Sequence, residues 1–125
     1  MPTTVLIVDD SKLARIVSGK AVAELQPDWQ RVEAGSAADA TAIVDGQPVD
    51  VVLIDFNMPD KDGLEFAGEL RERFPALPIA IITANIQDEV VARARAIDAA
   101  FVPKPITVEG LRGFLTGAAL RLRTP

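Results

Sequence analysis

The stretch Val51-Val52-Leu53-Ile54-Asp55-Phe56-Asn57-Met58-Pro59-Asp60 decides the fold. Its four aliphatic residues form a run too short for a helix, and polar and turn-forming residues follow at once. A run of this kind is typical of a strand that is buried on both faces of a parallel sheet. The stretch therefore predicts a central strand that ends in the carboxylate of Asp55.

Other short apolar runs also end in polar residues. They are Val5 to Val8 before Asp9-Asp10, Ile79 to Ile82 before Thr83-Ala84, and Ala100 to Val102 before Pro103-Lys104-Pro105. Together with a less apolar run in the second quarter of the chain, they predict strands at residues 4–9, 31–34, 49–55, 78–83 and 100–102.

Amphipathic segments with helical spacing lie between and after these strands. In the first, the apolar positions include Leu13, Ile16, Val17, Ala21 and Val22. N-terminal caps are predicted at Ser11, Ser36 and Thr107. A solvent-exposed helix face is predicted for Glu65, Glu69, Arg71, Glu72 and Arg73. Regular alternation of strand and helix predicts a three-layer α/β fold, with a parallel five-stranded sheet and helices on both faces.

Length and composition limit the function. The chain has 125 residues, no Cys and no His, and a net charge of −5 from 13 basic and 18 acidic residues. This size predicts a single domain over residues 1–125 with no attached output domain. The acidic balance argues against nucleic acid as a partner. We expect no membrane segment and no signal peptide, and therefore a cytoplasmic protein.

The polar residues at the strand ends are predicted to form one site. In an open α/β sheet, ligands bind outside the carboxyl ends of the strands, where Asp9, Asp10, Asp55, Thr83 and Lys104 would meet. At about 4 Å, two carboxylates repel each other by about 4 kcal/mol at an effective dielectric near 20. A hard divalent cation would relieve this repulsion, and an open set of carboxylates suits Mg²⁺ better than Ca²⁺.

This set of residues resembles the receiver domain of two-component response regulators, particularly the stand-alone chemotaxis type. The residues that carry the resemblance are Asp9-Asp10, Asp55, Met58-Pro59-Asp60, Asp62-Gly63, Thr83-Ala84 and Lys104-Pro105, within a match over about residues 4–121. The resemblance implies a flavodoxin-like (βα)5 fold with strand order 2-1-3-4-5. It also implies a phosphoryl-accepting protein, and not an enzyme beyond its own phosphorylation and dephosphorylation.

Carried over to this chain, the resemblance gives each site residue a role. Asp55 would be the phosphoacceptor, and Asp9, Asp10, Asp55 and the backbone carbonyl of Asn57 would hold Mg²⁺. Thr83, the Ala84 N–H and Lys104 would bind the phosphoryl oxygens, and the Lys104-Pro105 peptide would be cis. Thr83 and Phe101 would form the switch, while Asn57 and Asn85 flank the site and could affect phosphate lifetime.

The resemblance also implies partners. A histidine kinase would donate the phosphoryl group, and a downstream protein would bind the face made by the helix around residues 90–97, strand 100–102 and the last helix. The chain would be a monomer or a weak homodimer. Three positions depart from the family pattern: Ile97 replaces a Gly that ends the helix, with Asp98 next, Phe101 replaces a common Tyr, and Pro103 precedes Lys104.

Three alternative functions are consistent with parts of this pattern. A relay protein would pass the phosphoryl group to a further histidine. A docking module would no longer accept phosphate, which intact Asp10, Asp55, Thr83 and Lys104 argue against. A phosphatase with an Asp nucleophile usually has a second Asp two residues later, where this chain has Asn57.

Overall fold

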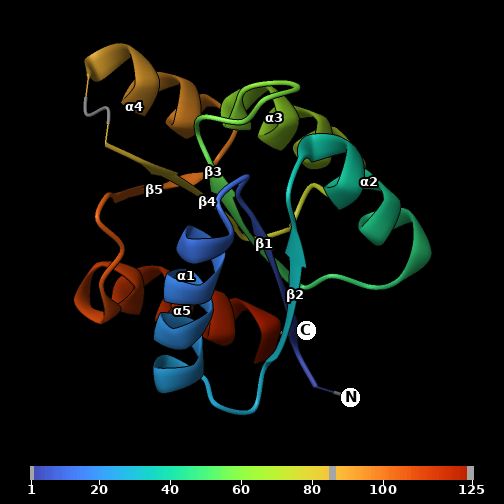
Figure 1. The fold of residues 1–125 in the computed structure, drawn as a ribbon, viewed down its shortest axis with the longest axis vertical. Coiled ribbons are helices and arrows are strands. Elements are labelled where there is room, and N and C mark those ends of the chain that lie inside the picture. The colour runs from blue at the N-terminus through green and yellow to red at the C-terminus, as the bar shows by residue number, and fades with distance from the viewer. Residues whose placement is uncertain (1, 85–86, 124–125) are drawn as a thin grey trace.

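The computed structural model describes residues 2–84 and 87–123, which form five strands and five helices in strict alternation. The elements are β1 (Thr4–Val8), α1 (Lys12–Leu25), β2 (Gln30–Ala34), α2 (Ala37–Gly46), β3 (Val51–Asp55), α3 (Gly63–Arg73), β4 (Ile79–Thr83), α4 (Asp88–Ala96), β5 (Ala100–Pro103) and α5 (Val108–Arg123). Figure 1 shows the central sheet with helices packed around it.

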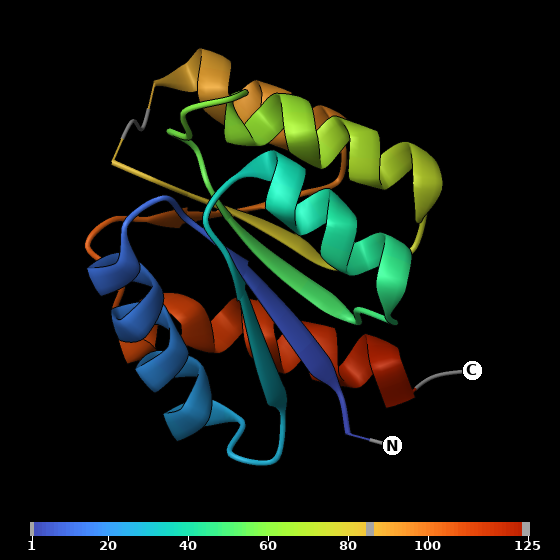
Figure 2. The same ribbon diagram turned by 45° about the vertical axis from the view of Figure 1, so that its right-hand side comes forward.

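All strands are parallel, in the order β2-β1-β3-β4-β5. Figure 2 shows three layers, with α1 and α5 on one face of the sheet and α2, α3 and α4 on the other. Alternate residues of each strand point to opposite faces, so Val5 and Ile7 pack on the side of α1 and α5, and Leu6 and Val8 on the other side. The predicted fold class and strand order are confirmed.

The predicted helix caps are confirmed. Backbone N–H groups donate to the side-chain oxygens of Ser11, Ser36 and Thr107 at distances of 3.2, 3.1 and 2.9 Å. Each bond satisfies one donor that the first turn of a helix leaves without a partner. Strand bounds differ slightly: β1 ends at Val8 instead of residue 9, because the Asp9 carbonyl accepts a hydrogen bond from Arg15 and not from a neighbouring strand.

The apolar face predicted for the first helix is partly wrong. Leu13, Ile16 and Val17 are 71%, 40% and 43% exposed, whereas Ser18, Ala21 and Val22 are buried. Two neighbouring stripes of this helix are apolar, and the spacing of residues alone cannot select the one that packs on the sheet. The stripe that is buried holds the smaller side chains, which allow the helix to approach closely.

The predicted solvent-exposed face of α3 is wrong at Arg71. Its guanidinium donates to the carbonyl oxygens of Ile97 and Asp98 at 2.8 and 3.0 Å, and to those of Phe74 and Pro75 at 3.2 and 3.1 Å. These bonds join the ends of α3 and α4. Asp98 adopts the left-handed conformation there, with φ of 54°, in the role for which the family pattern has Gly.

No helix within residues 2–84 and 87–123 is long and apolar enough to cross a membrane. Asn85, which the sequence suggests as a neighbour of the site, lies outside the described residues.

Candidate functional site

The carboxyl ends of four strands bring the predicted residues together at one edge of the sheet. Asp9 follows β1, Asp55 ends β3, Thr83 ends β4 and Lys104 follows β5. Buried aliphatic residues precede Asp9, Asp55 and Thr83, so the interior of the sheet holds the backbone from which these side chains project. Asp9, Asp55 and Thr83 are themselves buried, with exposed fractions of 6%, 2% and 0%.

Three carboxylates meet in this site. One oxygen from each of Asp9, Asp10 and Asp55 lies within 4.8 Å of the other two. Burial raises the pKa of Asp55 above its ordinary value, and the Asp10 charge adds to this effect, while Lys104 opposes it. Burial likewise raises the pKa of Asp9, with smaller contributions from Asp55 and Asp10. The protein therefore holds negative charge where it is poorly solvated.

Lys104 supplies a positive charge to the cluster. Its Nζ lies 2.7 Å from Asp55 Oδ1, and its backbone N–H donates to the Thr83 carbonyl at 2.9 Å. Partial burial lowers the pKa of Lys104, but the hydrogen bond and charge of Asp55 outweigh burial, so the pKa is raised. The Lys104-Pro105 peptide is cis, as the resemblance implies.

The donor set fits a hard divalent cation. The buried Asp55 Oδ1 has no partner among the described residues other than Lys104. One ammonium cannot neutralise three carboxylates, and oxygen ligands with an exposed member, Asp10, leave room for the waters that Mg²⁺ retains. The charge and the ligand type therefore both agree with the magnesium site that the sequence predicts.

The other predicted residues lie around this cluster. Ala84 is exposed and follows Thr83 directly, while Asn57 is exposed in the loop after β3. Phe101 is not part of the cluster. It lies on β5, is half-buried, and packs against the apolar core on the side of α4.

Sequence reasoning missed why a glycine follows Asp62. A Cβ added to Gly63 would lie 2.3 Å from the Asp55 carbonyl oxygen and 3.0 Å from Phe56 Cα, both backbone atoms. The Gly63 N–H donates to the Phe56 carbonyl at 2.8 Å, which holds the start of α3 directly against the end of β3. A sequence signal existed in Asp62-Gly63, but only the structure shows the close approach behind it.

Asp60 also has a role that the sequence did not reveal. Its two carboxylate oxygens accept hydrogen bonds from the N–H groups of Ala38 and Ala37, at 3.0 and 3.2 Å. These bonds hold the pKa of Asp60 below its ordinary value, and the bond from Ala38 has the largest effect. Asp60 thereby ties the loop after Asp55 to the start of α2.

Comparisons with known proteins agree with this geometry. Residues 5–116 match the response regulator receiver domain family. The chain is 37% identical over 111 residues to the probable transcriptional regulatory protein TcrX of Mycobacterium tuberculosis, a match over 86% of this chain and 46% of TcrX. It is 36% identical over 114 residues to the cyclic di-GMP phosphodiesterase response regulator RpfG of Xanthomonas campestris, a match over 86% of this chain and 29% of RpfG. The chain thus spans less than half the length of these two relatives.

A solved structure has the same fold. The chemotaxis response regulator CheY4 of Vibrio cholerae superposes with a TM-score of 0.82 at 26% identity, over 94% of this chain and 99% of CheY4. The strand order, the residues at the strand ends and the match over nearly the whole chain lead to one conclusion. This chain belongs to the response regulator receiver domain family of two-component systems.

Proposed function

We propose that Asp55 accepts a phosphoryl group from the phosphohistidine of a partner histidine kinase, with Mg²⁺ held by Asp9, Asp10, Asp55 and the Asn57 carbonyl. The observation that carries this proposal is the Asp55 carboxylate, which is 2% exposed and lies 2.7 Å from Lys104 within a cluster of three carboxylates. Acidic side chains that burial and a nearby charged side chain perturb in this way are typical of functional sites.

In the proposed step, an Asp55 oxygen attacks phosphorus and forms a P–O bond. The P–N bond to the donor histidine breaks, and the ring leaves with the bonding electron pair and takes up a proton from solvent to become neutral imidazole. Mg²⁺, when bound, neutralises charge on the phosphoryl oxygens. Lys104 would do the same, because its ammonium already lies 2.7 Å from an oxygen of Asp55.

The metal assignment predicts a large effect at Asp10. We expect Asp10→Ala to weaken Mg²⁺ binding by more than about 10-fold, because it removes a direct anionic ligand and leaves two of the three carboxylates. Asp9→Ala should have a smaller effect if Asp9 binds through water. Calorimetric titration of unphosphorylated protein measures both.

Asp28→Ala is the matched control, since Asp28 is exposed in the loop between α1 and β2 and its removal changes the net charge equally. Asp28→Ala should bind Mg²⁺ as the wild type does. Wild-type affinity in Asp10→Ala would overturn the metal assignment.

We propose that phosphorylation changes the surface made by α4, β5 and α5, and that a downstream protein binds there. A phosphorylated Asp55 carries about −1.5 to −2 charges, by analogy with phosphoserine, which would draw Thr83 and Lys104 closer. Thr83 is fully buried next to β5, with which β4 pairs through Ile81 and Phe101. Movement of Thr83 would therefore change the space available to Phe101.

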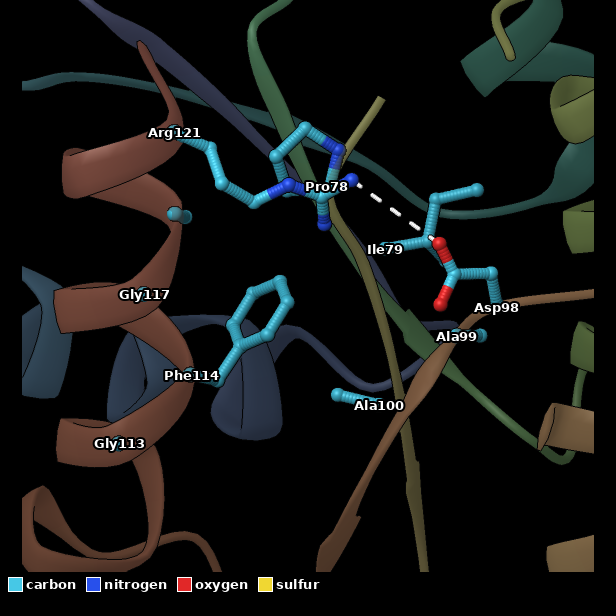
Figure 3. Close-up of a pocket in the computed structure, with 10 residues that line it drawn as sticks. Pro78, Ile79, Asp98, Ala99, Ala100, Gly113, Phe114, Gly117 and Arg121 are labelled. Atoms are coloured by element: carbon cyan, nitrogen blue, oxygen red, sulfur yellow. Dashed lines mark ion pairs between the residues drawn. The ribbon is translucent and has the colours of Figure 1, made fainter. Parts of the chain in front are cut away.

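A cavity of about 260 Å³ lies between α5 and the first residues of β4 and β5, at the other end of these strands from Thr83. Figure 3 shows Phe114 projecting from α5 beside Gly113 and Gly117, with Ala100 of β5 opposite and the Asp98–Arg121 ion pair, 3.9 Å long, at one end. Since two glycines leave α5 without side chains here, a partner side chain could enter between the helix and the strand. This cavity supports a protein partner at this face.

The switch proposal predicts a loss of coupling in Thr83→Ala. In wild-type protein, beryllofluoride, a mimic of the phosphoryl group, should shift the NMR signals of the Phe101 ring and of β5. In Thr83→Ala these shifts should largely disappear, because the hydroxyl that follows the phosphoryl group is absent; usual couplings between sites are about 1 to 3 kcal/mol. Thr41→Ala, which removes a hydroxyl bonded within α2, should leave them unchanged. Wild-type shifts confined to the loops around Asp55 would refute this switch.

A further inference from the structure

Arg15 of α1 contacts the backbone of Asp9, in the loop after β1, and the family resemblance gave this arginine no role. Its Nη1 donates to the backbone carbonyl of Asp9 at 2.7 Å, and its Nε donates to Glu33 Oε1 of β2 at 2.8 Å. The Arg15 side chain is only 18% exposed, and Nη1 also lies close to the backbone of Gly35, 3.6 Å from the position of a Cβ there. The guanidinium is thus held between α1, β2 and the end of β1.

The Asp9 carbonyl belongs to the peptide group that joins Asp9 to Asp10. On the other side of Asp9, its N–H donates to the Ala34 carbonyl at 3.0 Å, and its Oδ1 accepts from the Ser11 N–H at 2.9 Å. Asp9 is therefore held at its backbone N–H, its carbonyl and one carboxylate oxygen. Of these contacts, the one with Arg15 fixes the plane of the peptide from which Asp10 continues.

We propose that Arg15 is a positioning residue, which orients the Asp9-Asp10 peptide so that both carboxylates face the cation site beside Asp55. This inference rests on the proposed function, because it concerns the same Mg²⁺. Glu33 acts through Arg15, since it binds Nε and so orients the guanidinium. Partners that orient metal ligands in this way typically contribute 10- to 100-fold to metal affinity.

The sign of the effect separates positioning from simple electrostatics. Arg15 is a cation near a cation site, so loss of its charge alone would strengthen Mg²⁺ binding. Loss of its hydrogen bond to the Asp9 carbonyl would release the peptide and weaken Mg²⁺ binding. The two roles therefore predict opposite changes in the same variant.

The test is an NMR titration of unphosphorylated protein with MgCl₂, followed through the amides of residues 9–12. We expect Arg15→Met to weaken Mg²⁺ binding about 10-fold. Arg15→Lys should weaken it nearly as much, because an ammonium keeps the charge but cannot bond Asp9 and Glu33 with the geometry of a guanidinium. Arg112→Met, which breaks an exposed ion pair on α5, should bind as the wild type does.

Glu33 provides a second route to the same answer if Arg15→Met fails to fold. Its side chain is 48% exposed, so Glu33→Ala should fold and weaken Mg²⁺ binding several-fold. Because loss of its negative charge alone would act in the same direction, the amide nitrogen of Asp10 must also shift in this variant without Mg²⁺. The unfolding free energy in urea without Mg²⁺ is measured alongside, since a merely structural role would lower it and leave the dissociation constant unchanged. The proposal would be overturned if Arg15→Met bound Mg²⁺ as tightly as the wild type or more tightly. If Arg15→Met does not fold, unchanged Mg²⁺ binding in Glu33→Ala would overturn it.

A metal-free measurement keeps this inference separate from the proposed function. A hydrogen bond to the Asp9 carbonyl polarises the peptide, so the amide nitrogen of Asp10 should shift in Arg15→Met without any Mg²⁺. If the wild type did not bind Mg²⁺, the metal assignment would fail, and the Asp10 shift would still report on the peptide. An unchanged Asp10 shift would show that Arg15 does not orient it.

Discussion

Asp55→Asn is expected to abolish phosphoryl incorporation completely while the fold is retained. The amide keeps the size and planar shape of the carboxylate but lacks the anionic nucleophile that attacks phosphorus. With acetyl phosphate and Mg²⁺, the wild type should gain one hydroxylamine-labile phosphoryl group, located on Asp55 by mass spectrometry. Asp55→Asn should gain none.

The same variant should be at least as stable as the wild type at neutral pH. Burial raises the pKa of Asp55 in the folded protein, so the protein is less stable when Asp55 is ionised than when it is protonated. The free energy of unfolding therefore rises as the pH falls and Asp55 binds a proton. A neutral amide removes this effect at every pH. Lys104 loses its partner, but its side chain is 35% exposed and can be hydrated.

Asp28→Asn, which makes the same chemical change at an exposed position, is the control and should be labelled as the wild type is. Undiminished labelling of Asp55→Asn, or a label mapped to another residue in the wild type, would show that Asp55 is not the acceptor. Denaturation curves recorded with the labelling keep loss of the nucleophile apart from loss of the fold.

The strands could be predicted because parallel strands buried on both faces need short aliphatic runs, and few other structures do. Val5 to Val8 and Val51 to Ile54 show this pattern directly, and both are fully buried. The face of α1 could not be predicted, because Leu13 and Val17 lie on an apolar stripe next to the one that packs. Periodicity gives the presence of such a helix, but packing selects its orientation.

The candidate site, too, could be predicted only in part. Asp9, Asp55 and Lys104 could be predicted to meet because topology alone brings strand ends together. Arg15 and Arg71 could not, since each acts through backbone carbonyls that come from distant parts of the chain. A sequence shows which side chains can donate hydrogen bonds, but carbonyl acceptors are the same at every residue and give no signal.

Gly63→Ala is expected to lower the unfolding free energy by about 1 to 3 kcal/mol or more, the usual range for overpacking. The added methyl group would lie 2.3 Å from the Asp55 carbonyl oxygen, and 3.0 Å from both Asp55 C and Phe56 Cα. These are backbone atoms of β3 and the loop that follows it, so no side chain can move aside. The start of α3 must shift away, which would break the hydrogen bond from Gly63 N–H to the Phe56 carbonyl and displace Asp55 from Lys104.

Gly68→Ala, on the same helix, is the matched control, because a Cβ there meets nothing within 4 Å. Alanine is the better helix former by about 1 kcal/mol, so this variant should be more stable than the wild type. The two substitutions are chemically identical and should change stability in opposite directions in urea denaturation. Only Gly63→Ala should also slow phosphorylation by acetyl phosphate, because only Gly63 touches the backbone of the acceptor residue. Wild-type stability and labelling in Gly63→Ala would mean that α3 can move away from Asp55 freely, and that this contact does not position the acceptor.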